Sequence, residues 1–152
     1  MIKILCVGKI KDKNLSAMID SYLDKIKHYH NINIIEVKDE PINANEKDVL
    51  EKEADRLLDK IANDEYVILL DLHGKNIDSI SLANKLDKLF ISNSKITFVI
   101  GGSLGLSDRL RNRANEAIKL SDLTFLHQMT RLILIEQIYR SFKILNNETY
   151  HK

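Results

Sequence analysis

Short, unbroken runs of hydrophobic residues recur along the chain, each ending near a glycine or a polar turn. The clearest runs cover residues 2–8, 32–37, 66–72 and 95–100. Runs of this length without polar alternation are typical of strands buried on both faces, as in a parallel sheet. The pattern predicts four such strands, and residues 119–125 form a short fifth strand or strand-like loop.

Between these runs, hydrophobic residues recur at three- and four-residue spacing, which is the period of an amphipathic helix. The spacing predicts helices over residues 14–29, 46–62, 108–118 and 127–145, and a further helix capped by Ser79 or Ser81. Strands that alternate with helices predict an α/β fold, with a mostly parallel sheet and helices on both faces. At 152 residues, a single domain over 1–152 is expected.

The helix over residues 127–145 is hydrophobic over well over half of its circumference. One apolar stripe is enough to pack a helix against a sheet. The hydrophobic surface beyond one stripe is explained either by a subunit interface, which we favour, or by burial within the core of the monomer.

A glycine-rich loop, GGSLG at 101–105, follows the strand over 95–100. Ligands of open α/β sheets bind at the carboxyl ends of the strands, where glycine lets the backbone approach a ligand closely. The loop lacks the Gly-Lys-Ser/Thr of a P-loop and the spacing of a dinucleotide fingerprint, and a plain turn is the alternative. With residues 70–72 and 120–125, it predicts a pocket of exposed backbone suited to adenine and methionine-like ligands.

Composition and charge narrow the classes of partner. The single cysteine and five scattered histidines give no metal-ligand spacing, so no metal is expected. No hydrophobic run approaches the length of a membrane span and no signal peptide is recognisable, so we expect a cytoplasmic protein. The net charge of +1 divides into about −6 over residues 36–65, about +1 over residues 66–100 and about +3 in each end segment, 1–35 and 101–152. A nucleic-acid partner is expected to meet the two ends of the chain, although a solvated surface explains the same asymmetry.

Candidate polar residues gather toward the carboxyl end of the chain. Spacings of four residues place His127 with Arg131, and Glu136 with Arg140, on shared helical faces. The pair Glu136–Arg140 is also explained by mutual neutralisation within an apolar helix. The tail Tyr150-His151-Lys152 suits stacking on a base and holding a phosphate, or is simply a disordered terminus.

Five motifs together resemble one known family. They are IKILCVGKIK at 2–11, LDLHGK at 70–75, FVIGGSLGLS at 98–107, LSDLTFLHQMTRLILIEQIYRSFKI at 120–144 and the closing TYHK at 149–152. Their order and spacing resemble the ribosomal large subunit methyltransferase H family, small members of the SPOUT (α/β-knot) methyltransferases. The resemblance covers nearly the whole chain.

The resemblance implies a C-terminal trefoil knot, a homodimer with the cofactor pocket near the interface, and methyl transfer from S-adenosyl-L-methionine. The acceptor it implies is N3 of a pseudouridine in the helix 69 loop of 23S rRNA, in the assembled 70S ribosome. The implied cofactor contacts are Leu70, Gly101, Leu120, Ser121, Asp122, Leu123, Thr124 and Phe125. One residue departs from the family pattern, because Leu126 stands where a proline is common, and it puts the path of residues 120–127 in doubt.

The chemistry suggests roles for the polar residues. The proton on N3 must leave, and His127 or His151 is the candidate base. Arg131, Arg140 and Lys152 are candidates for neutralising developing charge or phosphate, and Tyr150, His151 and Lys152 for contacting RNA. Two alternatives remain: a non-catalytic nucleotide- or ribosome-binding α/β module, and a SPOUT methyltransferase that acts on another RNA.

Overall fold

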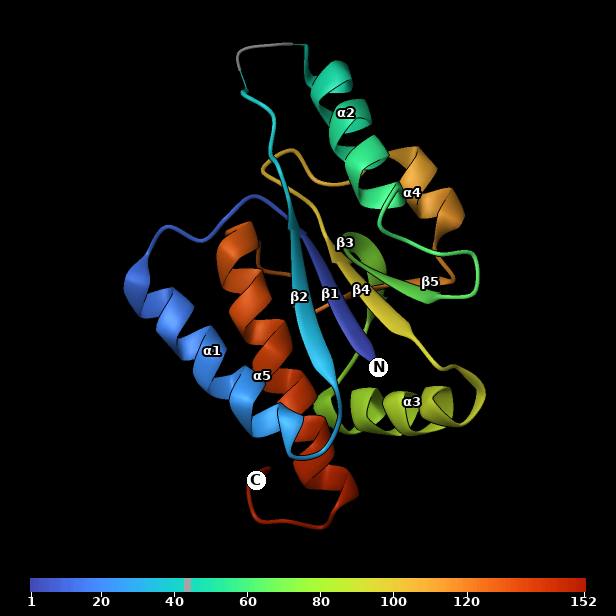
Figure 1. The fold of residues 1–152 in the computed structure, drawn as a ribbon. Helices are drawn as coiled ribbons and strands as arrows, with labels where there is room; N and C mark the ends of the chain where they lie inside the picture. The colour runs from blue at the N-terminus through green and yellow to red at the C-terminus, as the bar shows by residue number, and fades with distance from the viewer. Residues whose placement is uncertain (43–44) are drawn as a thin grey trace.

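Strands and helices alternate along the chain in the computed structural model, which describes residues 1–42 and 45–152 (Figure 1). The strands are β1 (Ile2–Val7), β2 (Ile32–Val37), β3 (Tyr66–Asn76), β4 (Ile96–Ile100) and β5 (Glu116–Lys119). The helices are α1 (Lys13–Lys27), α2 (Glu46–Leu58), α3 (Ser79–Ser92), α4 (Asp108–Arg113) and α5 (His127–Leu145).

The five strands form one sheet in the order β2-β1-β4-β3-β5, and every neighbouring pair is parallel. The central strands β1 and β4 are buried along their whole length, as expected for hydrophobic runs without polar alternation. The predicted α/β class and parallel sheet are therefore confirmed.

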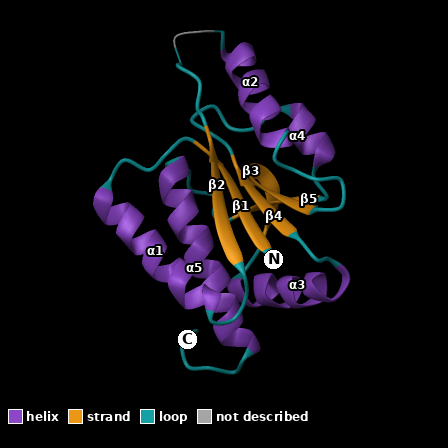
Figure 2. Cartoon of the chain, in the orientation of Figure 1, coloured by secondary structure: helices purple, strands orange, loops and turns teal. Residues whose placement is uncertain are grey.

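Helices cover both faces of the sheet, also as predicted (Figure 2). One core cluster joins α1, α3 and α5 to the sheet through residues such as Ile19, Leu86 and Ile138. The other joins α2 and α4 to the opposite face through Leu57 and Leu110. The carboxyl edge of the sheet thus lies between two helical layers.

Helix α5 packs between α1 and α3, and this position accounts for much of its hydrophobic surface. Leu134, Ile135 and Ile138 are fully buried against the sheet of the same chain. Leu132 is only half-buried, and Met129 is exposed at the start of the helix. The monomer core therefore explains most of the apolar excess, and the subunit interface remains a prediction.

The predicted helix over 108–118 is wrong in its second half. Helix α4 ends at Arg113, and Glu116–Lys119 forms edge strand β5. The reason lies in Asn115, whose backbone N–H donates to Val67 O at 2.9 Å while its side-chain oxygen accepts the Val67 N–H at 2.8 Å. Asn115 satisfies both polar groups of Val67 at once, and this pairing with β3 replaces the next helical turn.

Strand β3 is longer than predicted, running to Asn76 where a polar turn was expected after residue 72. Ile118 pairs with both Leu70 and Lys75, so the strand bulges between these two residues. Gly74 lies in the bulge, directly against the backbone of Ala117 and Ile118. The trefoil knot implied by the resemblance remains a prediction.

The helix expected to start at Ser79 or Ser81 is capped by neither serine. Asp78 is the N-cap of α3, and its carboxylate accepts the Ser81 N–H at 2.7 Å. Aspartate is among the preferred N-cap residues, and its negative charge is favourable at a helix amino terminus.

No helix in the described ranges 1–42 and 45–152 is long and hydrophobic enough to span a membrane.

Replacement of Gly74 by alanine is expected to lower the free energy of unfolding by at least ~2 kcal/mol. The added Cβ lies 2.7 Å from backbone atoms of Ala117 and Ile118, so β3 and β5 must move apart. Urea denaturation measures the loss. The control His73→Ala, at an exposed neighbouring position, is expected to change stability by less than about 0.5 kcal/mol. Equal stability of both variants contradicts the close contact.

Candidate functional site

A pocket of about 650 Å³ opens at the carboxyl ends of β3, β4 and β5. Three segments wall it: the end of β3, the loop after β4, and the loop that joins β5 to α5. Its lining includes Leu70, Asp71, Leu72, His73, Ile100–Leu106, Arg111, Ile118–Ser121, Leu123–His127 and Thr130. This is the edge of the sheet where the sequence places a ligand.

The loop after β4 exposes bare backbone to the pocket. It closes through the Gly105 N–H, which donates to Gly102 O at 3.1 Å, and Gly105 has a φ of +86° that favours glycine. A Cβ on Gly101 would overlap the carbonyl oxygen of Gly105. The loop therefore keeps this shape only with glycine at both ends, and peptide groups form this wall.

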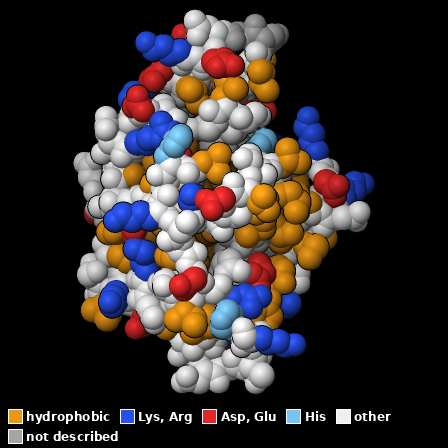
Figure 3. All heavy atoms as spheres, turned by 180° about the vertical axis from the view of Figure 1, so that it is seen from behind, with side chains coloured by type: hydrophobic (Ala, Val, Ile, Leu, Met, Phe, Trp, Pro, Cys, Tyr) orange, Lys and Arg blue, Asp and Glu red, His pale blue; other side chains and the backbone are white. Residues whose placement is uncertain are grey.

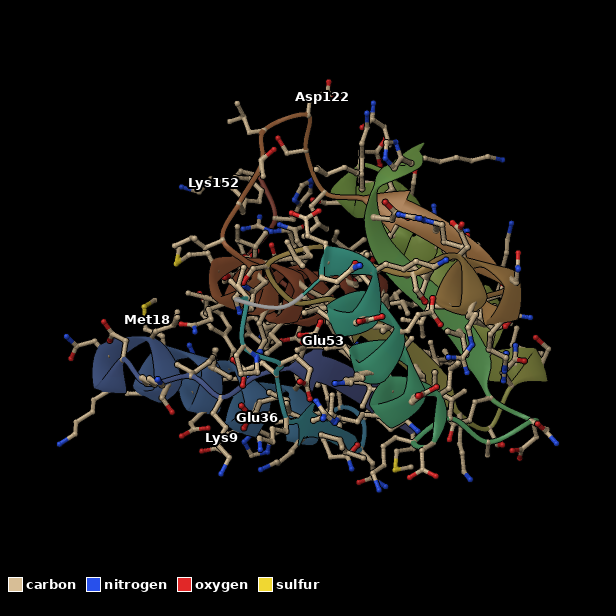
Figure 4. All side chains as sticks on the ribbon, turned by 90° about the horizontal axis from the view of Figure 1, so that it is seen from above. Lys9, Met18, Glu36, Glu53, Asp122 and Lys152 are labelled. Atoms are coloured by element: carbon tan, nitrogen blue, oxygen red, sulfur yellow. The ribbon has the colours of Figure 1, made fainter. Side chains whose placement is uncertain are left out.

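The loop between β5 and α5 forms a second wall, largely of backbone and apolar side chains. Ser121 Oγ accepts the Leu123 N–H at 3.0 Å, and Lys119 pairs with Asp122 at 2.5 Å. The side chains of Leu123 and Leu126 are 70% and 74% exposed. Figure 4, seen from above, shows Asp122 at the tip of this loop, on the side of the molecule opposite β2.

Leu126 does not divert the loop. Its φ of −56° and ψ of 138° are close to the values that proline adopts. The position therefore keeps the backbone expected where the family commonly has proline.

Seven of the eight residues expected to contact a cofactor line this pocket. They are Leu70, Gly101, Leu120, Ser121, Leu123, Thr124 and Phe125. Asp122 is not among the lining residues, because its exposed carboxylate points to Lys119. Its backbone lies in the same wall.

Asp71 and Arg111 both line the pocket, although no spacing in the sequence pairs them. Arg111 Nε donates to Asp71 Oδ2 at 2.7 Å, from α4 to the end of β3. Burial alone raises the pKa of Asp71, but hydrogen bonds from Arg111 and the His73 N–H outweigh it and lower the pKa. The only sequence signal was the position of Asp71 at a strand end, which fixes no partner 40 residues away.

His127 lines the pocket at the first turn of α5. Partial burial and the positive charge of Arg131 lower the pKa of its imidazole, and Asp39 opposes the shift. The ring is therefore neutral at pH 7 and able to accept a proton.

Arg131 is turned away from the pocket, with only 2% of its surface exposed. Its guanidinium donates to Glu36 Oε2 and to Gly8 O, each at 3.0 Å, while Nε has no partner among residues 1–42 and 45–152. These contacts tie α5 to β2 and to the turn after β1.

Arg140 and the tail form a separate cluster near the end of α5. Arg140 donates to Glu136 at 2.7 Å, lies 3.3 Å from His151 Nδ1, and stacks on the Tyr150 ring. Tyr150 also donates to Glu136 at 3.0 Å and packs edge-on against Tyr139. Burial, followed by the hydrogen bonds to Tyr22 and Glu136, raises the pKa of Tyr150. The tail is thus docked on the protein.

The two groups of candidate catalytic residues lie far apart within the chain. Arg140 lies thirteen positions after His127, which corresponds to about 20 Å along α5. Figure 1 shows the carboxyl terminus at the far end of α5 from the β5–α5 loop. A single chain therefore brings His127 into the pocket but not Arg140 or His151.

No group of three or more histidine, cysteine, aspartate or glutamate residues suited to a metal ion occurs among the residues described.

Comparisons with known proteins agree with these features. The family model described as "Predicted SPOUT methyltransferase" matches residues 1–151. Proteins named ribosomal RNA large subunit methyltransferase H are similar over 99% of this chain: one from Malacoplasma penetrans is 46% identical over 99% of its own length, and one from Desulforamulus reducens 48% over 98%. A solved structure of a probable methylase family protein from Haemophilus influenzae has the same fold, with a TM-score of 0.55 and 16% identity over 99% of this chain and 70% of that one.

The His127 imidazole is expected to titrate below its usual pKa of about 6.5. Removing the favourable charge with Asp39→Asn is expected to lower the His127 pKa further. NMR titration of the histidine ring protons measures both values, and exposed His28 is the internal control. Because the folded-state pKa is depressed, this group's contribution to stability is complete above about pH 6.5 and is lost as the pH falls below that value through the depressed pKa. A midpoint above 6.5 contradicts the burial of the ring.

Proposed function

The chain belongs to the SPOUT methyltransferase family, and on that premise we propose that it methylates 23S rRNA with S-adenosyl-L-methionine as donor. The acceptor is N3 of the pseudouridine in the helix 69 loop, methylated on the assembled 70S ribosome in the cytoplasm, and residues 1–152 act as one methyltransferase domain. The observation that carries the proposal is the pocket walled by glycine backbone and by residues 120–126, at the edge of the sheet where the resemblance puts the donor.

The pocket fits the donor in size and in chemistry. Its volume of about 650 Å³ lies within the range of small-molecule sites. Apolar side chains such as Leu70, Leu120 and Phe125 suit the flat adenine ring, and the free peptide groups of the two loops suit its nitrogen atoms and the amino-acid end. We assign the donor contacts to Leu70, Gly101 and residues 120–125, with Asp122 contributing only backbone.

Methyl transfer requires the protein to position the donor and the acceptor and to remove the N3 proton. When bound, S-adenosyl-L-methionine supplies a methyl group on a positively charged sulfur, which leaves as a neutral thioether. The pocket walls hold acceptor and donor in line, which is the main contribution to the rate. His127, neutral at pH 7, accepts the N3 proton as the N–C bond forms, so the acceptor carries no lasting charge. Arg131 acts as a positioning residue that fixes the start of α5.

We propose that a second copy of the chain completes the site. The tail cluster of Arg140, Tyr150, His151 and Lys152 lies about 20 Å from His127 along α5 of the same chain. Exposed apolar side chains beside the pocket, Leu123, Leu126 and Met129, suit a subunit interface. On the face seen in Figure 3, hydrophobic side chains gather at mid-height. A homodimer that covers them brings one subunit's tail to the other's pocket.

The tail then supplies what the pocket lacks. The His151 ring is a second candidate base, and Arg140 and Lys152 neutralise phosphate or the charge that develops on the pyrimidine. Tyr150 offers a ring for stacking on a base. The contacts of Tyr150 with Glu136 and Tyr139 order the tail before RNA arrives.

Methyl-labelled S-adenosyl-L-methionine tests the function directly. Purified protein is incubated with intact ribosomes that lack the modification and, in parallel, with free 23S rRNA. We expect label in the helix 69 pseudouridine of the ribosomes only. No label on either, with donor binding shown by calorimetry, indicates another RNA substrate. Absence of donor binding contradicts a methyltransferase and favours a non-catalytic binding module.

A mixed-subunit experiment tests the shared site. Gly101→Ala disables the pocket, because the Cβ overlaps Gly105 O, and deletion of residues 150–152 removes the tail. Each variant alone is expected to be inactive, and the tail-less variant is expected to bind the donor as the parent does. An equal mixture of refolded subunits regains roughly a quarter of parental activity, since about half the dimers are mixed and each has one complete site. A mixture as inactive as its components contradicts a shared site.

A further inference from the structure

A second hollow of about 550 Å³ lies between α3, the end of β3 and edge strand β5. Three lysines line it, Lys75 from β3 and Lys85 and Lys88 from α3. We call it the lysine groove; its other polar residues are Tyr66, Asn76, Ser81, Asn84 and Glu116.

The arginines of the chain already donate hydrogen bonds to acceptors of the same chain. The basic helix α4 illustrates this: Arg109 donates to Glu51 and Asp55, and Arg113 to the carbonyls of Ala62 and Glu65. Arg56, Arg111 and Arg131 also donate to acceptors of the same chain. Arg140 is paired with Glu136 as well, and it is the one arginine for which we propose a contact with the substrate. Sequence-independent binding of RNA depends on cations that reach phosphates, so lysines must supply most of them.

The lysine groove offers such cations. Within residues 1–42 and 45–152, neither Lys75 nor Lys88 has a salt-bridge partner. Glu116, the one carboxylate among the described residues that line the groove, is neutralised by Lys85 at 2.6 Å and accepts a hydrogen bond from the Tyr66 hydroxyl at 3.1 Å. The groove keeps two uncompensated positive charges.

The lysine groove adjoins the methyl-transfer pocket. Ile118 lines both, and His73 of the pocket is two residues from Lys75 of the groove, at most about 7 Å along the backbone. A nucleotide whose base enters the pocket therefore has its neighbours along the strand at the groove. Enzymes that act on an extruded base commonly contact the flanking nucleotides in this way.

Other parts of the surface fit RNA less well. Figure 4 shows Lys9 on the opposite side of the molecule from Asp122, away from the pocket loop. Segment 36–65, which includes α2, carries a net charge of about −6 and repels phosphate. On the face seen in Figure 3, Lys and Arg side chains lie on both sides of the hydrophobic group.

We propose that the lysine groove binds the phosphates of the nucleotides that flank the methylated base. The inference rests on the proposed function, because it presumes that an RNA base enters the pocket. Lys75 and Lys88 contact phosphate oxygens, and the amides of Asn76 and Asn84 and the hydroxyl of Ser81 donate to phosphate or ribose oxygens.

The double variant Lys75→Ala/Lys88→Ala tests the groove in two assays. In the first, binding of a fluorescein-labelled hairpin RNA is followed by anisotropy between 50 and 200 mM salt. We expect the log–log salt slope to become shallower by about 1.4, since each lost single-strand phosphate contact removes about 0.7. In the second, methylation of ribosomes is expected to show kcat/KM about ten-fold lower and kcat within about two-fold. Donor affinity is expected to be unchanged.

Two controls separate charge at the groove from charge in general. Lys47→Ala/Lys52→Ala removes the same charge from exposed positions of α2 and is expected to leave both assays unchanged. Lys75→Arg/Lys88→Arg is expected to keep the parental slope, because the charge remains. The proposal is overturned if Lys75→Ala/Lys88→Ala keeps the parental salt slope and the parental KM. It is also overturned if KM for ribosomes rises while the salt slope stays the same, because that result indicates that the lysines contact a protein. If the parent methylates neither ribosomes nor free 23S rRNA, the proposed function is contradicted. The anisotropy assay does not depend on methylation and still tests whether the groove binds phosphate.

Discussion

The buried guanidinium of Arg131 is the contact on which the arrangement of the site depends. It joins α5 to β2 through Glu36 and to the turn after β1 through Gly8 O. A buried charged group is costly, and within the part of the chain that the structure describes the two 3.0 Å contacts compensate this one while Nε is left without a partner. Because α5 starts four residues earlier at His127, this anchor sets where the pocket wall over 120–126 ends and where the imidazole lies. Arg131 thus shapes the pocket without entering it.

The position of α5 also separates the candidate catalytic residues into two groups, one at each end of the helix. The helix is 19 residues long, so its two ends lie at different places in the molecule. His127 faces the pocket, while Arg140 and the tail are held by Glu136 and the tyrosines at the other end. Within one chain the two groups stay at opposite ends of α5, and the proposed homodimer is the arrangement that would bring the second group to the first. Met129, near the start of the helix, is one of the apolar side chains that the monomer leaves exposed.

Much of the fold followed from hydrophobic pattern, and the failures have identifiable causes. Strand β2 and helix α5 have the predicted bounds, because uninterrupted apolar runs and helical spacing are both strong signals. Helix α4 was overextended because DRLRNRANEAI has helical propensity throughout, whereas the pairing of Asn115 with Val67 is a contact between distant segments. The pocket lining was largely predictable from motif positions along the chain. The Asp71–Arg111 pair was not, since no local spacing links β3 to α4.

Charge distribution shows why a near-neutral protein need not be a poor partner for RNA. Net charge describes the molecule at long range, but binding depends on which cations remain free at contact. In this chain the arginines stabilise helix–helix and helix–strand contacts, as Arg109 does between α4 and α2. The positive charge of segment 101–152 suggested a nucleic-acid surface, whereas the arginines of α4 within that segment donate to acceptors of the chain itself. The free lysines of α3 and β3 lie instead beside the pocket, where a few phosphate contacts align a strand whose base has entered it.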